Sequence, residues 1–453
     1  MAAPMLLRSA LASVKGLQVE RARRGQAYHA VRRELRERRH WDGAAFAAHR
    51  DRLIVATVRN AARFVPFYRE VFRERGMSPD DFATAADLDR LPVVDKGTVR
   101  EDPDRFVDER SPRRGRMVLH TTGTSGTPLR IVTDRAARQV NYAFFDDYLA
   151  SFGIGPRDRR ATIGGRVVAP ADRDRPPFWV HSWYQRTLFM SSYHLSAANI
   201  SHYIRALRRF QPKFIDAYPS SCHAMARWML DEGIRDIRVQ AVLTSSETLF
   251  PEQRAAIEAA FGCPVFDQYG AAEMCVFVGQ CGTGRYHLRP DYGHVEILSN
   301  GAPAPPGHEG ELVCTGFVNP VMPLIRYRIG DVGMWSAEEC PCGLATPLLH
   351  RVIGREDDVI RTPDGRAIGR LSPVLKGFPL LEAQFVQDAL NHLTLRLAPA
   401  PGYRPAHTAQ IVEEVRKRVP SSMHITPEFV THIPRGPGGK FRAVVSLVSS
   451  SGG

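Results

Sequence analysis

The chain has 453 residues, of which 43% are hydrophobic and 24% charged, and its formal net charge is +13. This composition is typical of a soluble globular protein with room for a large and a small domain, and it excludes a low-complexity chain. No apolar run approaches the ~20 residues that a helix needs to cross a bilayer, so we expect no membrane span and a cytoplasmic location.

The N-terminal segment carries much of the positive charge. Residues 1–40 hold ten Arg or Lys and three Glu, which is +7 of the total. One interpretation is an arm for nucleic acid or an acidic membrane surface, and the other is an ordinary polar helix face. Glu34 and Glu37 interrupt the basic run, and no aromatic residues alternate with it to stack on bases. We therefore favour the helix face and expect no nucleic-acid partner.

Residues 16–85 are predicted to be helical. Apolar residues in LIVATVRNAARFVPFYREVFRERG, 53–76, recur at roughly helical spacing. Pro66 should divide this stretch, because proline lacks an N–H group and its ring clashes with the preceding turn.

The next informative segment is HTTGTSGTPLR, residues 120–130. Seven of its eleven residues are Thr, Ser or Gly. Small residues let the backbone approach a ligand closely, and the N–H and hydroxyl groups are donors that suit a polyphosphate. It is not a Walker A loop, because no Gly-Lys-Ser/Thr follows. The alternative is a polar surface loop.

A helix is predicted over NYAFFDDYLASFG, residues 141–153. Its aromatic residues are either the lining of an acyl pocket or part of the core, since aromatic residues at helical spacing are more often core. These residues are Tyr142, Phe144, Phe145 and Tyr148.

Strands and helices then alternate from residue 161 to 270, which favours βαβ units and a largely parallel sheet. From Tyr286 to Met334 the chain becomes β-rich, with Gly and Pro turns. Beyond Arg355 a compact α+β unit follows. We predict an α/β fold with a large domain, residues 1–356, and a small domain, residues 357–453, that meet at a hinge at Asp357–Asp358.

The seven cysteines argue against a disulfide framework in a cytoplasmic protein. Three thiols and one imidazole would make a closed tetrahedral zinc site, and the chain offers Cys281, His287, Cys340 and Cys342. Cys275 is a substitute ligand, and the alternative is a set of buried thiols with a surface histidine. Cys222, Cys263 and Cys314 are interpreted as structural.

Five stretches occur in a fixed order: HTTGTSGTPLR, DQYGAAE (267–273), RYRIGD (326–331), GREDDVI (354–360) and PRGPGGK (434–440). This ordered set resembles the adenylate-forming enzymes, and within them the phenylacetate–CoA ligase-like branch with its capsular-polysaccharide-biosynthesis relatives. The resemblance extends from about Leu53 to Arg442. It implies a large domain of βαβ layers plus a distorted barrel, and a mobile small domain.

The resemblance also implies a role for each motif. Glu273 would hold Mg²⁺, Asp331 would accept hydrogen bonds from the ribose hydroxyls, and Lys440 would contact the reacting phosphate, with Glu273, Lys440 and Thr122 as catalytic residues. Tyr269 and Gly270 would lie at the adenine, bordered by Ser246 and Glu247, and Arg355 would reach the ribose or phosphate. The β- and γ-phosphates would be bound by Thr121, Thr122, Gly123, Thr124, Ser125, Gly126 and Thr127.

The implied reaction is ATP- and Mg²⁺-dependent activation of a carboxylic acid, followed by transfer to a thiol such as CoA. One departure leaves the acceptor open, because the chain has DDVIRTPDGRAIG, residues 357–369, where phenylacetate–CoA ligases usually have an Arg-Gly-Val-Asn type segment. An amine, a hydroxyl or a carrier protein is the alternative acceptor. A catalytically inactive nucleotide-binding or scaffold protein is the alternative from another class, and a homodimer is compatible with either.

Overall fold

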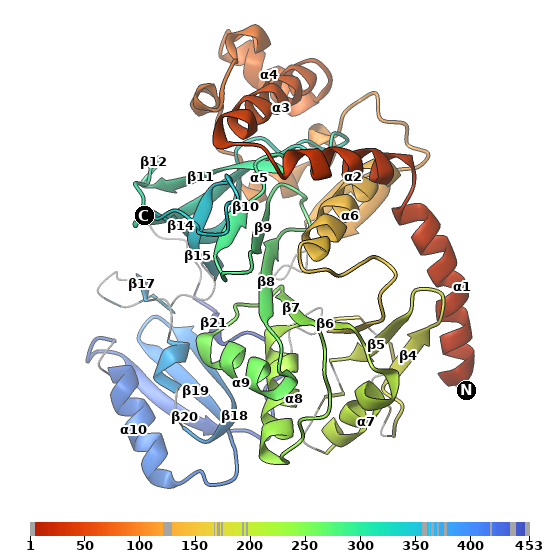
Figure 1. Ribbon diagram of the computed structural model, residues 1–453. Helices are drawn as coiled ribbons and strands as arrows, with labels where there is room; N and C mark the ends of the chain where they lie inside the picture. The colour runs from red at the N-terminus through yellow and green to blue at the C-terminus, as the bar shows by residue number, and fades with distance from the viewer. Residues whose placement is uncertain are drawn as a thin grey trace.

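The computed structural model describes residues 5–448 apart from 121–128, 167, 170–172, 174, 193, 196–197, 356–359, 362, 364–366, 369–370, 376–377, 417–418 and 435–440. It has a large sheet-rich part, flanked by N-terminal helices, and a small C-terminal part (Figure 1). This arrangement confirms the predicted α/β fold class.

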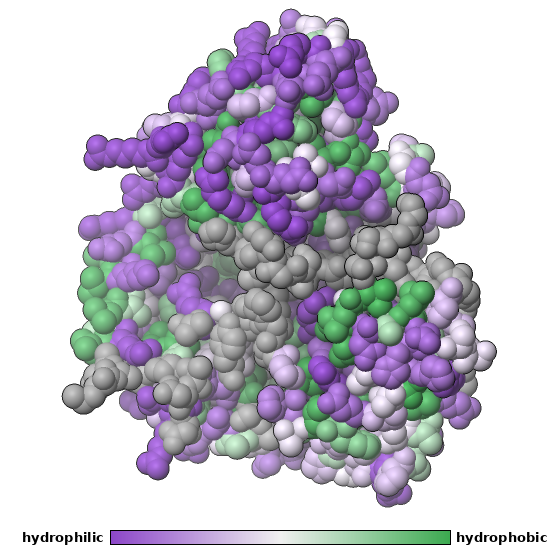
Figure 2. Space-filling model, turned by 180° about the vertical axis from the view of Figure 1, so that it is seen from behind, coloured by the Kyte–Doolittle hydropathy of each residue, from purple (hydrophilic) through white to green (hydrophobic). Residues whose placement is uncertain are grey.

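The N-terminal region is helical, as predicted. Its helices are α1 (Met5–Arg23), α2 (Gln26–Arg38), α3 (Gly43–Phe64), α4 (Pro66–Glu74) and, after two short 3-10 turns, α5 (Lys96–Glu101). Asp42 caps α3, because its side chain accepts a hydrogen bond from the N–H of Ala45. Pro66 ends this helix and begins α4, where its missing N–H is tolerated. Hydrophilic side chains cover most of the α3–α4 end of the molecule (Figure 2).

The basic residues of α1 and α2 pair with acidic residues of the large domain. Arg24 lies 3.1 Å from Asp146, and Arg32 lies 2.8 Å from Asp147. Arg38 lies 3.1 Å from Asp291, whose side chain is fully buried. The charge that suggested an arm therefore anchors these helices to the domain. No helix in the described part of the chain is long and apolar enough to cross a membrane.

Within the described residues, thirteen strands form one sheet in the order β12-β11-β13-β14-β15-β10-β9-β8-β7-β6-β3-β5-β4. Pairing is parallel among β5 (Thr187–Ser191), β3 (Arg160–Gly164), β6 (Phe214–Ala217), β7 (Ala241–Ser245) and β8 (Val265–Gly270), and β4 (Trp179–Ser182) is an antiparallel edge. We call β3 and β5–β8 the parallel half. It matches the βαβ pattern that the sequence predicts.

The rest of the sheet is antiparallel. Its strands are β9 (Phe277–Gln280), β10 (Tyr286–Leu288), β11 (Gly293–Ser299), β12 (Ala302–Pro303), β13 (Glu309–Gly316), β14 (Tyr327–Trp335) and β15 (Leu348–Arg355). We call β9–β15 the antiparallel half. Register shifts interrupt the pairing of β14 with both neighbours, so this half is irregular. It occupies the region for which the family resemblance implied a distorted barrel.

Helices cover both faces of the parallel half (Figure 1). The helices α7 (Ile200–Phe210), α8 (Pro219–Asp231) and α9 (Pro251–Phe261) bury one face against alternate strand residues such as Ile163 and Ile215. The opposite face carries Phe214 and Leu243, which pack with Leu149 of α6 (Arg135–Ala150). This alternation is the period-two pattern of strands that are buried on both sides.

The small C-terminal part is an α+β unit, as predicted. Its sheet has the order β20-β19-β18-β21. The elements are β16 (Ile360–Arg361), β17 (Ala367–Ile368), a 3-10 turn (Ser372–Leu375), β18 (Leu380–Ala389), β19 (His392–Pro399), α10 (Pro405–Arg416), β20 (His424–Phe429) and β21 (Val444–Ser446). Ile411 and Val415 of α10 and Phe385 of β18 are fully buried in its own core. The expected hinge at Asp357–Asp358 lies outside the described residues.

Candidate functional site

The carboxyl ends of β6, β7 and β8 lie at one edge of the sheet, because these strands are parallel. At the end of β7, Ser246 adopts a left-handed conformation with φ +72°, which is strained for a residue with a side chain. The chain thereby turns sharply, and Glu247 accepts a 3.0 Å hydrogen bond from the N–H of Ser220 in the first turn of α8. Exposed Gly270 ends β8 at the same edge.

Tyr269 and Asp331 come from motifs 62 residues apart, and they are in direct contact. The Tyr269 hydroxyl donates a 2.5 Å hydrogen bond to Oδ2 of Asp331, across from β8 to β14. Burial, together with the negative charge of Asp331, raises the pKa of Tyr269 well above its usual value. The tyrosine therefore stays a donor at neutral pH, and a carboxylate can accept several hydrogen bonds at once.

Glu273 makes a second connection of the same kind. It is only 6% exposed, and it accepts a 3.3 Å hydrogen bond from the hydroxyl of fully buried Tyr327 at the start of β14. Burial and then Glu273 raise the pKa of Tyr327. Two hydroxyl–carboxylate contacts thus join β8 and the segment that follows it to β14. Tyr327 was not predicted, although it lies in the RYRIGD motif.

The backbone of Arg355 lies opposite Asp331 in the β14–β15 pair. The register therefore brings the last residue of β15 beside the acidic residue that the family resemblance assigns to the ribose. The side chain of Arg355 lies outside the described part of the structure.

The predicted phosphate loop, Thr121–Thr127, and Lys440 lie outside the described residues. The strands that flank the loop are described: β1 (Met117–His120) pairs antiparallel with β2 (Arg130–Thr133), so that His120 lies opposite Arg130. The loop therefore joins the two strands of a hairpin, and β2 leads directly into α6.

Phe441, the residue after Lys440, contacts the large domain. Its N–H donates a 2.8 Å hydrogen bond to Oε1 of Glu247, 194 residues away. The small domain holds the same segment, since the N–H of Phe385 in β18 donates to the carbonyl of Ala443. Glu247 was predicted to border the adenine, which stays a prediction, and it also joins α8 to the small-domain segment through its contacts with Ser220 and Phe441.

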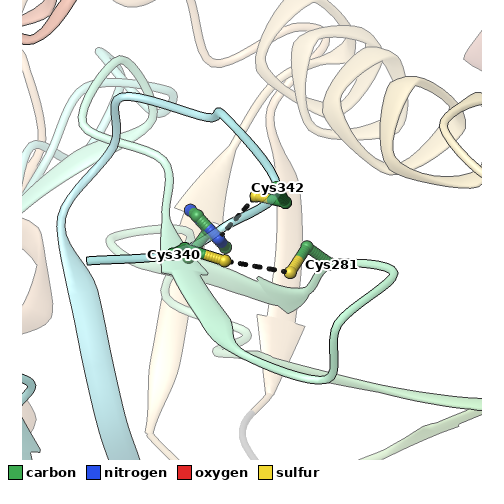
Figure 3. Close-up of side chains that lie close together, drawn as sticks. Cys281, Cys340 and Cys342 are labelled. Atoms are coloured by element: carbon green, nitrogen blue, oxygen red, sulfur yellow. Dashed lines mark hydrogen bonds between the residues drawn. The ribbon is translucent and has the colours of Figure 1, made fainter. Parts of the chain in front are cut away.

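Cys281, His287, Cys340 and Cys342 converge, and their ligand atoms all lie within 4.8 Å of one another. The three cysteine side chains point toward one another in Figure 3. The Cys281 and Cys340 sulfurs are 3.6 Å apart, and the Cys342 sulfur is 3.3 Å from Nε2 of His287. These separations are near the edges, about 3.8 Å, of a tetrahedron with zinc–sulfur bonds of about 2.3 Å.

The surroundings of His287 also suit a metal ligand. Its Nδ1 lies 2.8 Å from the Thr346 hydroxyl, the usual kind of second contact that orients a ligating imidazole. Burial lowers the pKa of His287 to about 4, so the ring is neutral at physiological pH. We call these four ligand residues the Cys–His cluster. It ties the loop between β14 and β15 to the β9–β10 hairpin.

The structure also bears on the assignments of Cys275 and of the aromatic residues of α6. Cys275 is fully buried in the core with Cys314 and is not part of the cluster, so its assignment as a substitute ligand is wrong. Phe144 packs edge-on against Tyr292 in the core. Tyr148 donates to the carbonyl of Gln280 and is also structural. The remaining two aromatic residues of α6, Tyr142 and Phe145, line a cavity.

The comparisons with known proteins concern the family and the fold. Residues 360–447 match the family model of the CapK C-terminal domain. The chain is 27% identical over 393 residues to protein CapK of Staphylococcus aureus, covering 84% of this chain and 85% of CapK. It is 26% identical over 319 residues to a phenylacetate–coenzyme A ligase of Thermus thermophilus, covering 65% and 67%.

Among solved structures, 2-hydroxyisobutyryl-CoA ligase in its postadenylation state with 2-HIB-AMP matches with a TM-score of 0.69. The identity is 22%, and the match covers 88% of this chain and 90% of that chain. This likeness shows the fold. Together, the matches confirm the resemblance that the five ordered motifs indicated.

Proposed function

Because the chain is a homologue of CapK and of phenylacetate–CoA ligases and shares the fold of adenylate-forming acyl-CoA ligases, we propose that it activates a carboxylic acid with ATP. A carboxylate oxygen attacks the α-phosphorus, the bond from that phosphorus to the bridging oxygen breaks, and pyrophosphate leaves. The product is a mixed acyl–phosphate anhydride, the acyl-adenylate. The observation that carries this proposal is the pair of contacts Tyr269–Asp331 and Glu273–Tyr327, which joins residues of two separate motifs, DQYGAAE and RYRIGD.

The residues divide the work by their chemistry. Asp331 would bind the ribose diol, since a carboxylate is an acceptor-only group, and Tyr269 holds it in place. Glu273 is a hard oxygen ligand in a buried position, which suits Mg²⁺. When bound, the ion would neutralise charge on the phosphates, as the loop Thr121–Thr127 and Lys440 are also proposed to do. The contact of Glu247 with Phe441 supports a role for the small domain in this step.

The second step would transfer the acyl group to CoA. The thiolate sulfur attacks the carbonyl carbon, and AMP leaves with the electron pair of the broken C–O bond. A second candidate acceptor is an amine, a hydroxyl or a carrier protein. The match of residues 360–447 to the CapK C-terminal domain supports this second candidate acceptor, because the segment that departs from the phenylacetate–CoA ligase pattern extends into the matched residues.

We also propose that the Cys–His cluster binds one structural zinc ion per chain. The distances and the Thr346 contact support it, and the cluster has no open position for chemistry, since all four ligands come from the protein.

The test is a screen of carboxylic acids for acid-dependent pyrophosphate release, with hydroxylamine added to trap the acyl group as a hydroxamate. We expect AMP, pyrophosphate and hydroxamate in equal amounts with a suitable acid, and then a thioester when CoA replaces hydroxylamine. Turnover with hydroxylamine but none with CoA would select the second candidate acceptor. Release of ADP, or AMP formation independent of any acid, would contradict the proposal, and nucleotide binding with no turnover would favour a scaffold.

A further inference from the structure

A cavity of about 170 Å³ lies between the parallel half and the helices α1 and α6. Its lining is strongly charged: four arginines face two aspartates, with aromatic residues and one threonine between them. The charged residues are Arg23, Arg24, Arg160, Arg166, Asp146 and Asp216. A pocket for a plain aromatic or aliphatic acid would instead be lined mostly by apolar side chains.

The sheet places the polar residues on one face. Arg160 and Thr162 alternate with Ala161 and Ile163 along β3, and the latter two are fully buried under α7 and α8. Thr162 lies opposite Asp216 in β6. The strand alternation therefore directs Arg160, Thr162 and Asp216 toward α6.

The charges in the cavity do not cancel. Arg24 lies 3.1 Å from Asp146, which also accepts a 2.7 Å hydrogen bond from Tyr28, so this pair is satisfied within the protein. Arg160 faces Asp216. Burial lowers the pKa of the arginine and raises the pKa of the aspartate, and the opposite charge of the partner reduces each of these shifts in part. Nε of Arg160 and Oγ1 of Thr162 are shielded from solvent without a hydrogen-bond partner among the described residues.

Two further arginines are held by aromatic rings. The Arg166 guanidinium lies 4.3 Å from the centre of the Phe189 ring, and that of Arg23 lies 4.3 Å from the centre of the Tyr142 ring. Stacking fixes the plane of a guanidinium and leaves its edge N–H groups available for a planar oxyanion. Arg166 is exposed, whereas Nε of Arg160 is shielded from solvent, and a shielded positive charge that Asp216 offsets only in part is unfavourable unless an anion binds. The cavity is therefore built for a negatively charged group.

The cavity lies on the same sheet as the candidate site. Thr162 and Asp216 are aligned with Leu243 of β7, two residues before the strand end at Ser245. At about 3.3 Å per residue, this is roughly 7 Å along the strand direction from the edge that carries Glu247, and β6 and β7 lie between β3 and β8. The helix that supplies Tyr142 and Phe145 follows β2 and the Thr121–Thr127 segment in the chain.

We propose that this cavity binds the far end of the acid substrate, and that the substrate carries a second carboxylate, which Arg160 and Arg166 bind. This substrate class rests on the acid activation proposed above. One carboxylate is adenylated at the strand ends, and the other remains in the cavity, where Thr162 donates a further hydrogen bond.

The first experiment is titration calorimetry on the full chain with matched acids: succinate, glutarate and adipate against butyrate, pentanoate and hexanoate. We expect at least one diacid to bind about tenfold to a hundredfold more tightly than its matched monoacid, the difference expected for a hydrogen-bonded charge pair. Equal or weaker binding of the diacids, including no binding of either class, would overturn the proposal. So would inorganic phosphate that binds more tightly than every diacid, because the cavity would then be a simple anion site.

Two variants with opposite expected signs exclude a merely structural effect. Arg166→Gln should remove the preference for the diacid, whereas Asp216→Asn should tighten diacid binding severalfold, because it removes a repelling carboxylate. Arg209→Gln, on the exposed side of α7, is the matched control and should change neither. A diacid preference that survives Arg166→Gln, or that weakens in Asp216→Asn while the melting temperature stays unchanged, would contradict the assignment.

The two proposals fail in different ways. Diacids that bind without any pyrophosphate release would leave the cavity assignment intact and contradict acid activation. Monoacids that are activated as efficiently as diacids would confirm acid activation and overturn the second carboxylate.

Discussion

The parallel and antiparallel halves of the sheet present their functional residues differently. In the parallel half, Glu247 and Tyr269 lie at strand ends, where the sequence of a connecting loop can change without disturbing the strands. In the antiparallel half, Asp331 lies within the paired strand β14, so its position depends on register, and a slip of one residue would turn it to the other face. The Cys–His cluster closes the loop that follows β14. We therefore expect substitutions at the strand ends of the parallel half to change chemistry, and substitutions at the Cys–His cluster to change stability.

The largest expected effect is at Glu273, where the two halves meet. Glu273→Gln keeps the shape and a hydrogen-bond acceptor for Tyr327 but removes the charge proposed to hold Mg²⁺. Adenylation should fall by about 10²–10³, the usual loss when a charged contact to the transition state is removed. The measurement is acid-dependent pyrophosphate release at saturating Mg²⁺.

Glu232→Gln, at an exposed position after α8, is the control and should retain full activity. A Glu273→Gln protein with normal turnover would remove this residue from the site.

The second prediction concerns stability in the antiparallel half. Cys342→Ser should abolish zinc binding and lower the free energy of unfolding, because a ligand that binds only the folded state at 100 to 1,000 times its Kd stabilises it by roughly 2.7–4.1 kcal/mol. The measurements are metal analysis of chelator-free protein and denaturant unfolding with and without a chelator.

Cys263→Ser, outside the cluster, should keep its zinc. Metal-free wild-type protein whose stability does not respond to a chelator would contradict the zinc assignment.

The motif residues and the Cys–His cluster could be predicted from the sequence alone. The five motifs predicted that Tyr269, Glu273 and Asp331 act together, because motif order reflects fold. The cluster followed from ligand chemistry, although Cys275 could be excluded only by its burial beside Cys314.

The charged cavity could not be predicted in this way. It needs β3, β6 and α6 to meet, and Asp216 of β6 is far from Arg160 and Thr162 of β3 in the chain. Their only signal was the polar residues at alternate positions of otherwise apolar strands, which is ambiguous without the strand pairing. Likewise, nothing in the sequence indicates that Glu247 reaches Phe441.

The third prediction sharpens the role of the strand ends. Glu247→Gln should slow adenylation by about tenfold, because a hydrogen bond to a charged group contributes about 1.5–3 kcal/mol and a neutral amide replaces it only in part. The measurement is the single-turnover rate of acyl-adenylate formation, with thermal unfolding as the structural control. A lower melting temperature with an unchanged rate would show that Glu247 only supports α8.

The smallest effect is expected at Tyr269. Tyr269→Phe removes the hydroxyl that orients Asp331 and keeps the ring, so the KM for ATP should rise by about threefold to tenfold, as expected for one hydrogen bond. Steady-state kinetics with varied ATP measure it, and Tyr184→Phe, which is 48% exposed, is the control. A changed KM for the acid alone would instead place Tyr269 at the acyl end of the site.

The central claim is that the chain forms an acyl-adenylate with help from the small domain, and Lys440 tests it most directly. The measurement compares two half-reactions in wild type, Lys440→Ala and the exposed control Lys15→Ala: acid-dependent exchange of labelled pyrophosphate into ATP, and acyl transfer from chemically supplied acyl-adenylate. We predict that Lys440→Ala reduces exchange by about 10²–10³ and largely spares transfer, because the ammonium is needed only while the α-phosphorus reacts. An equal loss in both half-reactions, or exchange at the wild-type rate, would contradict the account.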